Sequence, residues 1–258
     1  MSHTIAACQF EPVLGAVERN CATVRELATG LSDDAEVAVF PELCLTGYDL
    51  EIAAEAATPV PGPFTDRVID IAADAGQTLV VGLPERDGDA VYNSLVAVSP
   101  EGVAGCYRKQ FPWGDEAGVF TAGSGPATIE TPVGTVGFLL CYDLNFPEAA
   151  LEYARLGVDC LAVSAAWRES FRADWELLLR ARALDTTCYV VGTNHAGDQS
   201  NRVHEGGSRI TGPDGALLVS AENGRETVET TVEPAALDAA SDRNPVAETR
   251  SSRDRRRE

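Results

Sequence analysis

The segment Val136-Gly-Phe-Leu-Leu-Cys141-Tyr-Asp-Leu-Asn-Phe-Pro147-Glu joins an apolar run to a cysteine and then to a proline suited to the first turn of a helix. A turn from strand to helix lifts its side chain clear of the sheet, and the backbone amides that follow can face an oxyanion. Cys141 is therefore a candidate nucleophile. The alternative is an ordinary small core residue, since free cysteines are often buried.

Short runs rich in valine, isoleucine and leucine on both sides of this segment predict further strands. The expected strands cover residues 4–8, 36–40, 78–83, 92–98, 103–107, 135–140, 159–164, 189–193, 207–211, 216–220 and 227–232. Apolar residues three and four apart predict helices over residues 17–31, 65–75, 147–156 and 171–186. So many strands with so few helices favour an α/β fold in which two sheets pack face to face with helices outside.

The domain organisation follows from composition. No linker rich in glycine, serine or proline divides the chain, so we expect a single domain over residues 1–240 and a polar tail over residues 241–258. The chain turns polar after Pro234 and ends Ser-Ser-Arg-Asp-Arg-Arg-Arg-Glu, which favours an extended, solvated tail. An arm that crosses onto a partner subunit is the alternative.

The charge balance limits the possible partners. A net charge of -20 and a pI near 4.4 argue against nucleic acid and against an anionic membrane surface, because both would be repelled. An acidic chain with almost no lysine is expected of a protein that works at high salt. With no basic and apolar leader in the first ten residues and no long apolar run, we expect a cytoplasmic protein, and the high-salt cytoplasm of a halophile is a hypothesis.

Cysteine and histidine are placed unfavourably for a metal or a disulfide framework. The seven cysteines include no Cys-x-x-Cys pair, and the only histidines are His3, His195 and His204. We therefore expect no metal and no cofactor.

Two further residues suit a reaction at a carbonyl carbon. Glu42 follows the apolar run Val37-Ala-Val-Phe and could lie beside Cys141 as a base, although a surface glutamate is the alternative. Lys109 is the single lysine among nineteen arginines. An ammonium is a compact charge that can approach an oxyanion closely, so a site that requires an amine would explain why this one lysine is present. Its chance survival is the alternative.

Three motifs in order resemble those of the nitrilase superfamily of carbon-nitrogen hydrolases, and the resemblance extends from Thr4 to about Val232. The motifs are Phe40-Pro-Glu42-Leu-Cys-Leu-Thr-Gly-Tyr48, Tyr107-Arg-Lys109-Gln-Phe-Pro-Trp-Gly-Asp-Glu116 and Leu140-Cys141-Tyr-Asp-Leu-Asn-Phe-Pro-Glu148. Gln110, Asp185 and Thr186 depart from the usual pattern without removing a motif's central residue.

The resemblance implies a four-layer α-β-β-α sandwich that associates as a homodimer or higher homo-oligomer. It also implies a catalytic triad of Glu42, Lys109 and Cys141, with Glu116 as a second acid. Four aromatic residues are candidates for substrate contact, although each could instead be packing: Tyr48, Trp113, Tyr142 and Trp167.

The function expected from these residues is hydrolysis of a small amide to an acid and ammonia or an amine through a cysteine thioester. A nitrilase or N-carbamoyl amidase with the same triad remains open. A catalytically inactive protein of this fold that binds a small molecule also remains open. A further alternative is a papain-like pair of a cysteine with His195 or His204 as the base.

Overall fold

Two six-stranded sheets form the framework of the computed structural model, which describes residues 3–199, 202–246 and 249. In sheet order, the first sheet contains β14 (Glu226–Thr231), β1 (Thr4–Gln9), β2 (Ala35–Val39), β3 (Thr78–Asp87), β4 (Ala90–Ser99) and β5 (Gly102–Arg108). The second contains β13 (Leu217–Ser220), β12 (Arg209–Thr211), β9 (Tyr189–Asn194), β8 (Cys160–Ala165), β7 (Gly134–Leu140) and β6 (Thr128–Thr131). The strands β7, β8 and β9 are mutually parallel, as are β1, β2 and β3.

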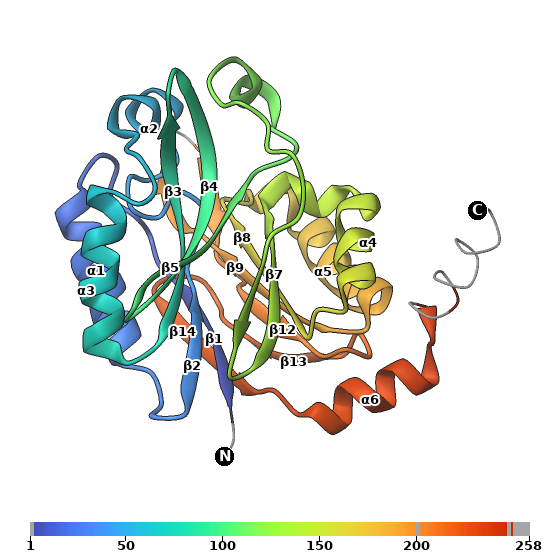
Figure 1. Ribbon diagram of the computed structural model, residues 1–258. Coiled ribbons are helices and arrows are strands. Elements are labelled where there is room, and N and C mark those ends of the chain that lie inside the picture. The colour runs from blue at the N-terminus through green and yellow to red at the C-terminus, as the bar shows by residue number, and fades with distance from the viewer. Residues whose placement is uncertain (1–2, 200–201, 247–248, 250–258) are drawn as a thin grey trace.

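Helices cover the outer face of each sheet (Figure 1). Against the first sheet lie α1 (Val17–Thr29) and α3 (Pro63–Ala75), and against the second lie α4 (Pro147–Leu156) and α5 (Arg172–Thr186). The order is therefore helix, sheet, sheet, helix, which confirms the four-layer α-β-β-α sandwich expected from the sequence.

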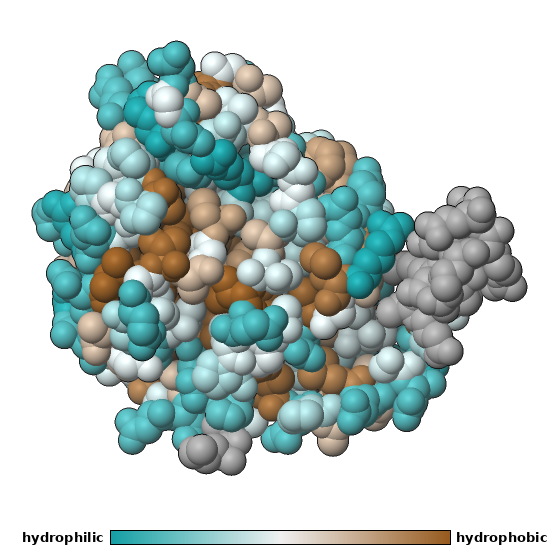
Figure 2. Space-filling model, in the orientation of Figure 1, coloured by the Kyte–Doolittle hydropathy of each residue, from teal (hydrophilic) through white to brown (hydrophobic). Residues whose placement is uncertain are grey.

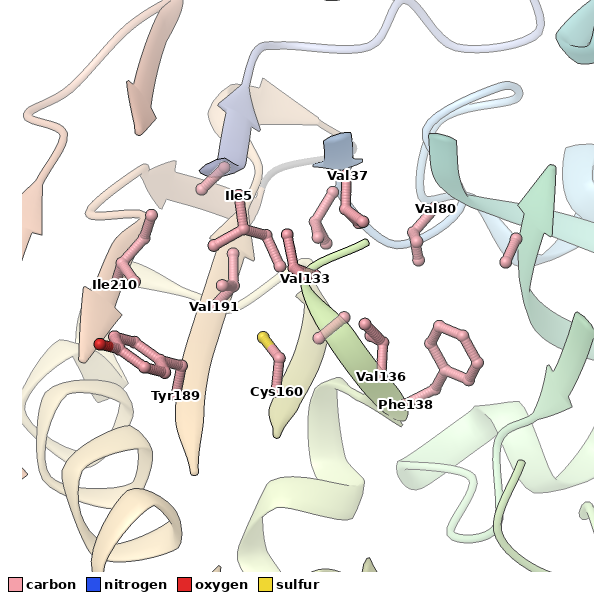
Figure 3. Packing of buried hydrophobic residues seen from close by; sticks show 14 of the residues in the cluster. Ile5, Val37, Val80, Val133, Val136, Phe138, Cys160, Tyr189, Val191 and Ile210 are labelled. Atoms are coloured by element: carbon pink, nitrogen blue, oxygen red, sulfur yellow. The ribbon is translucent and has the colours of Figure 1, made fainter. Parts of the chain in front are cut away.

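The core lies between the sheets because alternate residues of each strand point inward. Ile5, Val37 and Val80 of the first sheet face Val136 and Val191 of the second, as Figure 3 shows. Neighbouring residues such as Ala6 and Ala38 point outward and pack against α1 and α3 instead. Both faces of each sheet are buried, which explains why its central strands are almost wholly apolar.

The structure adds elements that the sequence did not predict. They are the strands β6, β10 (Ala196–Gln199) and β11 (Arg202–Glu205), and the helices α2 (Leu50–Ala56) and α6 (Pro234–Arg243). The strands contain too few alternating apolar residues to be recognised. The expected extended chain after Pro234 is wrong as far as Arg243, because this segment begins a helix with proline in its first turn and buries Ala240. The rest of the expected tail lies mostly outside the described residues.

Hydrophilic and hydrophobic residues are distributed unevenly over the surface. Figure 2 shows hydrophilic residues along the margins of one face and hydrophobic residues near its middle. Large exposed apolar side chains are found mainly on the second sheet and its helix: Leu177 is 66% exposed, and Leu184, Leu217 and Leu218 are also exposed.

Candidate active site

Three strand ends bring the predicted residues together. Glu42 follows β2, Lys109 follows β5 and Cys141 follows β7, so residues 32 or more positions apart meet where the two sheets face each other. Sites in α/β proteins commonly form at the carboxyl ends of strands, since successive loops meet there.

Cys141 stands at a sharp turn. It begins the short 3-10 helix η2 (Cys141–Asn145) with φ of 46°, a left-handed conformation that is uncommon for a residue with a side chain. Asp143 stabilises this turn, because its carboxylate accepts hydrogen bonds from Leu140 N at 3.1 Å, Phe111 N at 2.8 Å and the Tyr107 hydroxyl at 2.8 Å. Burial raises the pKa of Asp143 to about 6. The turn at Cys141 is thus held by the buried carboxylate of Asp143, which lies two residues further along the same segment.

The turn that contains Glu42 packs closely on β3. A Cβ on Gly82 would lie only 2.7 Å from the Cα of Glu42, so glycine is required for this approach. The Glu42 carboxylate accepts hydrogen bonds from Asn93 Nδ2 at 2.7 Å and from Ala166 N at 3.0 Å. Glu42 is wholly buried, and these donors together with Lys109 give both of its carboxylate oxygens hydrogen-bond partners.

Lys109 lies between two carboxylates. Its Nζ is 2.7 Å from Glu42 Oε1 and 2.8 Å from Glu116 Oε2, and all three side chains are buried. Burial acts to lower the pKa of Lys109, but Glu42 and then Glu116 outweigh it, so the net shift is upward. Lys109 therefore remains an ammonium ion.

Glu116 is held independently of Lys109. It accepts a hydrogen bond from the Tyr48 hydroxyl at 2.5 Å and another from Trp113 N at 2.7 Å. Burial raises the pKa of Tyr48 well above its ordinary value, so its hydroxyl keeps its proton and can donate. The family resemblance alone pointed to Glu116, and the structure places it beside Glu42 and Lys109.

The Cys141 thiol is protonated in the resting state. Burial, followed by the negative charge of Glu42, raises its pKa well above the ordinary value, while Lys109 opposes this shift. A thiol in such surroundings becomes nucleophilic only when a neighbouring base takes its proton.

A cavity of about 170 Å³ opens above Cys141. The four aromatic residues predicted to contact substrate, Tyr48, Trp113, Tyr142 and Trp167, all line it. The remaining lining residues were not predicted, because nothing in their local sequence marks them: they are Asn145, Ala166, Arg168, Phe171 and Asp174. An apolar cavity with a few polar groups is typical of a site for a small molecule.

The histidines do not form a pair with the cysteine. His195 Nε2 is 2.5 Å from the backbone oxygen of Glu42, and the ring of His204 packs against that of His195 with centroids 5.3 Å apart. Burial lowers the pKa of His195 to about 4 and is the main cause that lowers the pKa of His204 to about 3. Within the described residues neither histidine hydrogen-bonds Cys141, which removes the structural basis for the papain-like alternative.

His195 instead supports the turn at Glu42. A carbonyl oxygen only accepts, so Nε2 must carry the ring proton. We expect His195→Leu to destabilise the fold by about 1–3 kcal/mol, because it leaves the buried Glu42 carbonyl without a donor. His195→Gln, which keeps an N–H, should lose less stability and retain more kcat. Denaturant unfolding and steady-state rates check both variants, and equal losses would show that the hydrogen bond is unimportant.

The same residue makes the stability depend on pH. The pKa of His195 is about 4 in the folded chain, below that of an unfolded histidine, so the unfolded state binds the extra proton first as pH falls. Between pH 7 and pH 5 this difference should cost roughly 2 kcal/mol. His195→Gln should therefore lose less stability than the wild type over this interval. A free energy of unfolding that falls equally with pH in both proteins would contradict the expectation.

Two other kinds of feature are absent from the part of the chain that the structure describes. No three or more histidine, cysteine, aspartate or glutamate side chains gather in an arrangement that could hold a metal ion. No described helix is both long and apolar enough to cross a membrane.

Comparison with known proteins identifies the family. The sequence matches the carbon-nitrogen hydrolase family over residues 4–242, and the chain belongs to that family of hydrolases. It is 32% identical to the 2-oxoglutaramate amidase of Bacillus subtilis, with 88% of each chain covered. It is 31% identical to the omega-amidase NIT2 of Homo sapiens, with 80% of this chain and 78% of that protein covered. The predicted membership of the nitrilase superfamily is confirmed.

A solved structure supports the fold. A mutant amidase from Nesterenkonia sp. AN1 superposes with a TM-score of 0.83 at 23% identity and covers 91% of this chain and 92% of that chain. That structure shows covalent addition of the acetamide moiety of fluoroacetamide at the active-site cysteine.

Proposed function

We propose that this chain hydrolyses the carbon-nitrogen bond of a small amide, with Cys141 as the nucleophile. The observation that carries the proposal is the buried group of Glu42, Lys109 and Glu116 behind a cavity whose lining includes Cys141. The amidases among the relatives and the covalent addition at the cysteine of the Nesterenkonia enzyme support an amide as the substrate.

In the proposed reaction, Glu42 takes the proton of the Cys141 thiol as the sulfur attacks the amide carbon. Lys109 and the backbone N–H of Tyr142 stabilise the oxyanion. Collapse of this intermediate breaks the carbon-nitrogen bond, and Glu42 returns the proton to the departing amine. A thioester on Cys141 remains.

Water completes the cycle. Glu42 takes a proton from the water that attacks the thioester, and the proton passes to the sulfur as the acid leaves. Glu116 keeps Lys109 in position and balances its charge throughout.

Ammonia release tests this function. The wild type should release ammonia from small amides at a rate proportional to enzyme concentration, with the matching carboxylic acid formed in equal amount. If nitriles or N-carbamoyl compounds are turned over and amides are not, the triad of Glu42, Lys109 and Cys141 serves one of those reactions instead. If the folded protein binds amides without releasing any product, it is the inactive binding protein instead.

The proposal also covers the domain organisation of the chain and the association of its copies. Residues 1–240 form one hydrolase domain, and the polar residues 241–258 follow it. We propose that two or more copies associate, since Leu177, Leu184, Leu217 and Leu218 leave apolar side chains exposed on α5 and β13. Sedimentation of the wild type and of Leu177→Asp tests this association, and a wild type that is monomeric at high concentration would contradict it.

A concentrated salt solution, such as a halophile's cytoplasm, is the proposed working environment. The net charge of -20 makes the folded chain repel itself in dilute buffer, and salt screens this repulsion. We expect the melting temperature to rise by several degrees between dilute buffer and molar potassium chloride. A melting temperature that stays constant or falls would contradict the expectation.

A further inference from the structure

One buried carboxylate joins the segment that carries Lys109 to the turn that carries Cys141. Asp143 Oδ1 accepts a hydrogen bond at 2.8 Å from the backbone N–H of Phe111, which lies just beyond Lys109. Asp143 Oδ2 accepts one at 3.1 Å from the N–H of Leu140, which directly precedes Cys141. Because Lys109 follows β5 of the first sheet and Cys141 follows β7 of the second, Asp143 connects the two sheets at the site.

A tyrosine and a glutamine complete this arrangement. The Tyr107 hydroxyl donates to Asp143 Oδ2 at 2.8 Å, and Gln110 Nε2 donates to the Tyr107 oxygen at 3.3 Å. Burial, followed by the charge of Asp143, raises the pKa of Tyr107 well above its ordinary value, so the hydroxyl keeps its proton. Since Gln110 donates to the hydroxyl oxygen, the proton of the phenol is directed toward the carboxylate. Gln110 departs from the usual motif, and this contact gives it a role beside the site.

Stacked rings form a second contact between the same two segments. The ring of Phe111 lies on that of Phe146, with centroids 3.7 Å apart and an angle of 10° between the planes. Phe146 directly follows η2, and its ring also meets the edge of Tyr142 with centroids 5.2 Å apart. The N–H of Tyr142 faces the oxyanion in the proposed reaction. The two segments are therefore fixed to each other by packing as well as by Asp143.

We propose that Asp143 is a positioning residue, whose ionised carboxylate holds the Cys141 sulfur at the distance from Lys109 that the reaction requires. This inference rests on the proposed amidase function and names a group outside the triad on which its rate depends. All three hydrogen bonds end on oxygens that only accept while Asp143 is charged. A proton on either oxygen would face one of the three donors, so protonation must weaken at least one bond and loosen the turn. A displacement of about 1 Å between reacting groups can lower a rate about 100-fold.

The arrangement predicts that turnover falls in mildly acidic solution. Burial raises the pKa of Asp143 to about 6, and Lys109 and then the hydrogen bond from Tyr107 oppose the shift. The carboxylate is therefore charged above about pH 6 and takes up a proton below it. The other charged or titratable groups of the described chain that face η2 are Lys109, Tyr107, Tyr153 of α4 and Arg182 of α5. The first three have raised pKa values and an arginine stays protonated, so Asp143 is the member of this group that changes charge near pH 6.

The first test is the acid midpoint, the pH at which kcat falls to half of its plateau. In the wild type we expect it near pH 6. Tyr107→Phe keeps the ring but removes one donor to the charged carboxylate, so the acid midpoint should rise by roughly one pH unit. KM should stay nearly unchanged, because Asp143 is wholly buried and does not line the cavity. Tyr153→Phe is the matched control: it removes another buried hydroxyl, which donates to Phe138 O, and should leave the acid midpoint in place.

Two further variants test the carboxylate and the glutamine. Asp143→Asn removes the charge at constant size and turns an N–H toward a backbone donor or the Tyr107 hydroxyl. Its kcat at pH 7 should fall about 100-fold with KM nearly unchanged, and the acid midpoint near pH 6 should disappear. Gln110→Leu should lower kcat by a smaller factor, since Tyr107 still donates. A thermal melt of each variant shows that it is folded.

The proposal is overturned if the acid midpoint of Tyr107→Phe coincides with that of the wild type, or if Tyr153→Phe shifts it equally. A folded Asp143→Asn with the kcat of the wild type would also overturn it, and if this variant does not fold, Tyr107→Phe still decides. Alkylation of Cys141 by iodoacetamide over the same pH range needs no substrate. The expected shift in alkylation, without turnover of any amide, would support the role of Asp143 and count against the amidase function alone.

Discussion

Cys141→Ala is expected to abolish amide turnover, with kcat falling by about 10⁴-fold or more, because no other group in the cavity can form the thioester. The fold should remain intact, since a smaller side chain at a partly exposed turn removes little buried volume. Ammonia release and a thermal melt of the same preparation measure the two effects. A Cys141→Ala protein that folds and still turns over amides at an ordinary rate would show that the cysteine is not the nucleophile.

A second cysteine provides the matched control. Cys106 on β5 is also partly exposed, and its thiol lies 3.6 Å from Glu85 Oε2, away from the cavity lining. Burial raises its pKa to about 12, so it is an inert thiol near neutral pH. Cys106→Ala should retain kcat, and a comparable loss in both variants would indicate that cysteine removal disturbs the fold in general.

Lys109→Met is expected to have the largest effect on stability. Removing the ammonium leaves the carboxylates of Glu42 and Glu116 buried close together without their shared counter-ion. Removing one partner of a buried ion pair commonly lowers the free energy of unfolding by about 3–5 kcal/mol. Activity should be lost as well, because no cation remains to stabilise the oxyanion. Chemical denaturation measures the stability, and ammonia release measures the activity.

A second variant can show whether Lys109→Met loses stability through charge repulsion or through a simple loss of packing. If charge repulsion is responsible, Lys109→Met combined with Glu116→Gln should regain part of the lost stability without regaining activity. If Lys109→Met alone proved as stable as the wild type, this would contradict the proposed role of Lys109 as a buried counter-ion.

The sequence predicted those parts of the site that local chemistry makes visible. Glu42 and Cys141 each follow an apolar run that ends at a turn, so their positions at strand ends could be expected. Lys109 was conspicuous because it is the only lysine. The pattern of strands and helices likewise predicted the two sheets with their outer helices.

Other parts of the site depend on contacts that no local pattern reveals. Asn93 and His195 reach Glu42 from 51 and 153 residues away in the sequence, and nothing in their immediate surroundings distinguishes them from other buried polar residues. The strands β10 and β11 were missed because Ala-Gly-Asp-Gln and Arg-Val-His-Glu lack alternating apolar side chains. They pair near the site, so Arg202 came within reach of Tyr48 only through the tertiary fold.

The most direct test of the proposed mechanism is mass spectrometry of the enzyme quenched during turnover of a small amide. We predict an adduct of the mass of the acyl group, confined to the peptide that contains Cys141, present during turnover and absent from Cys141→Ala. Turnover without any adduct on that peptide, or an adduct that persists in Cys141→Ala, would contradict a thioester on this cysteine.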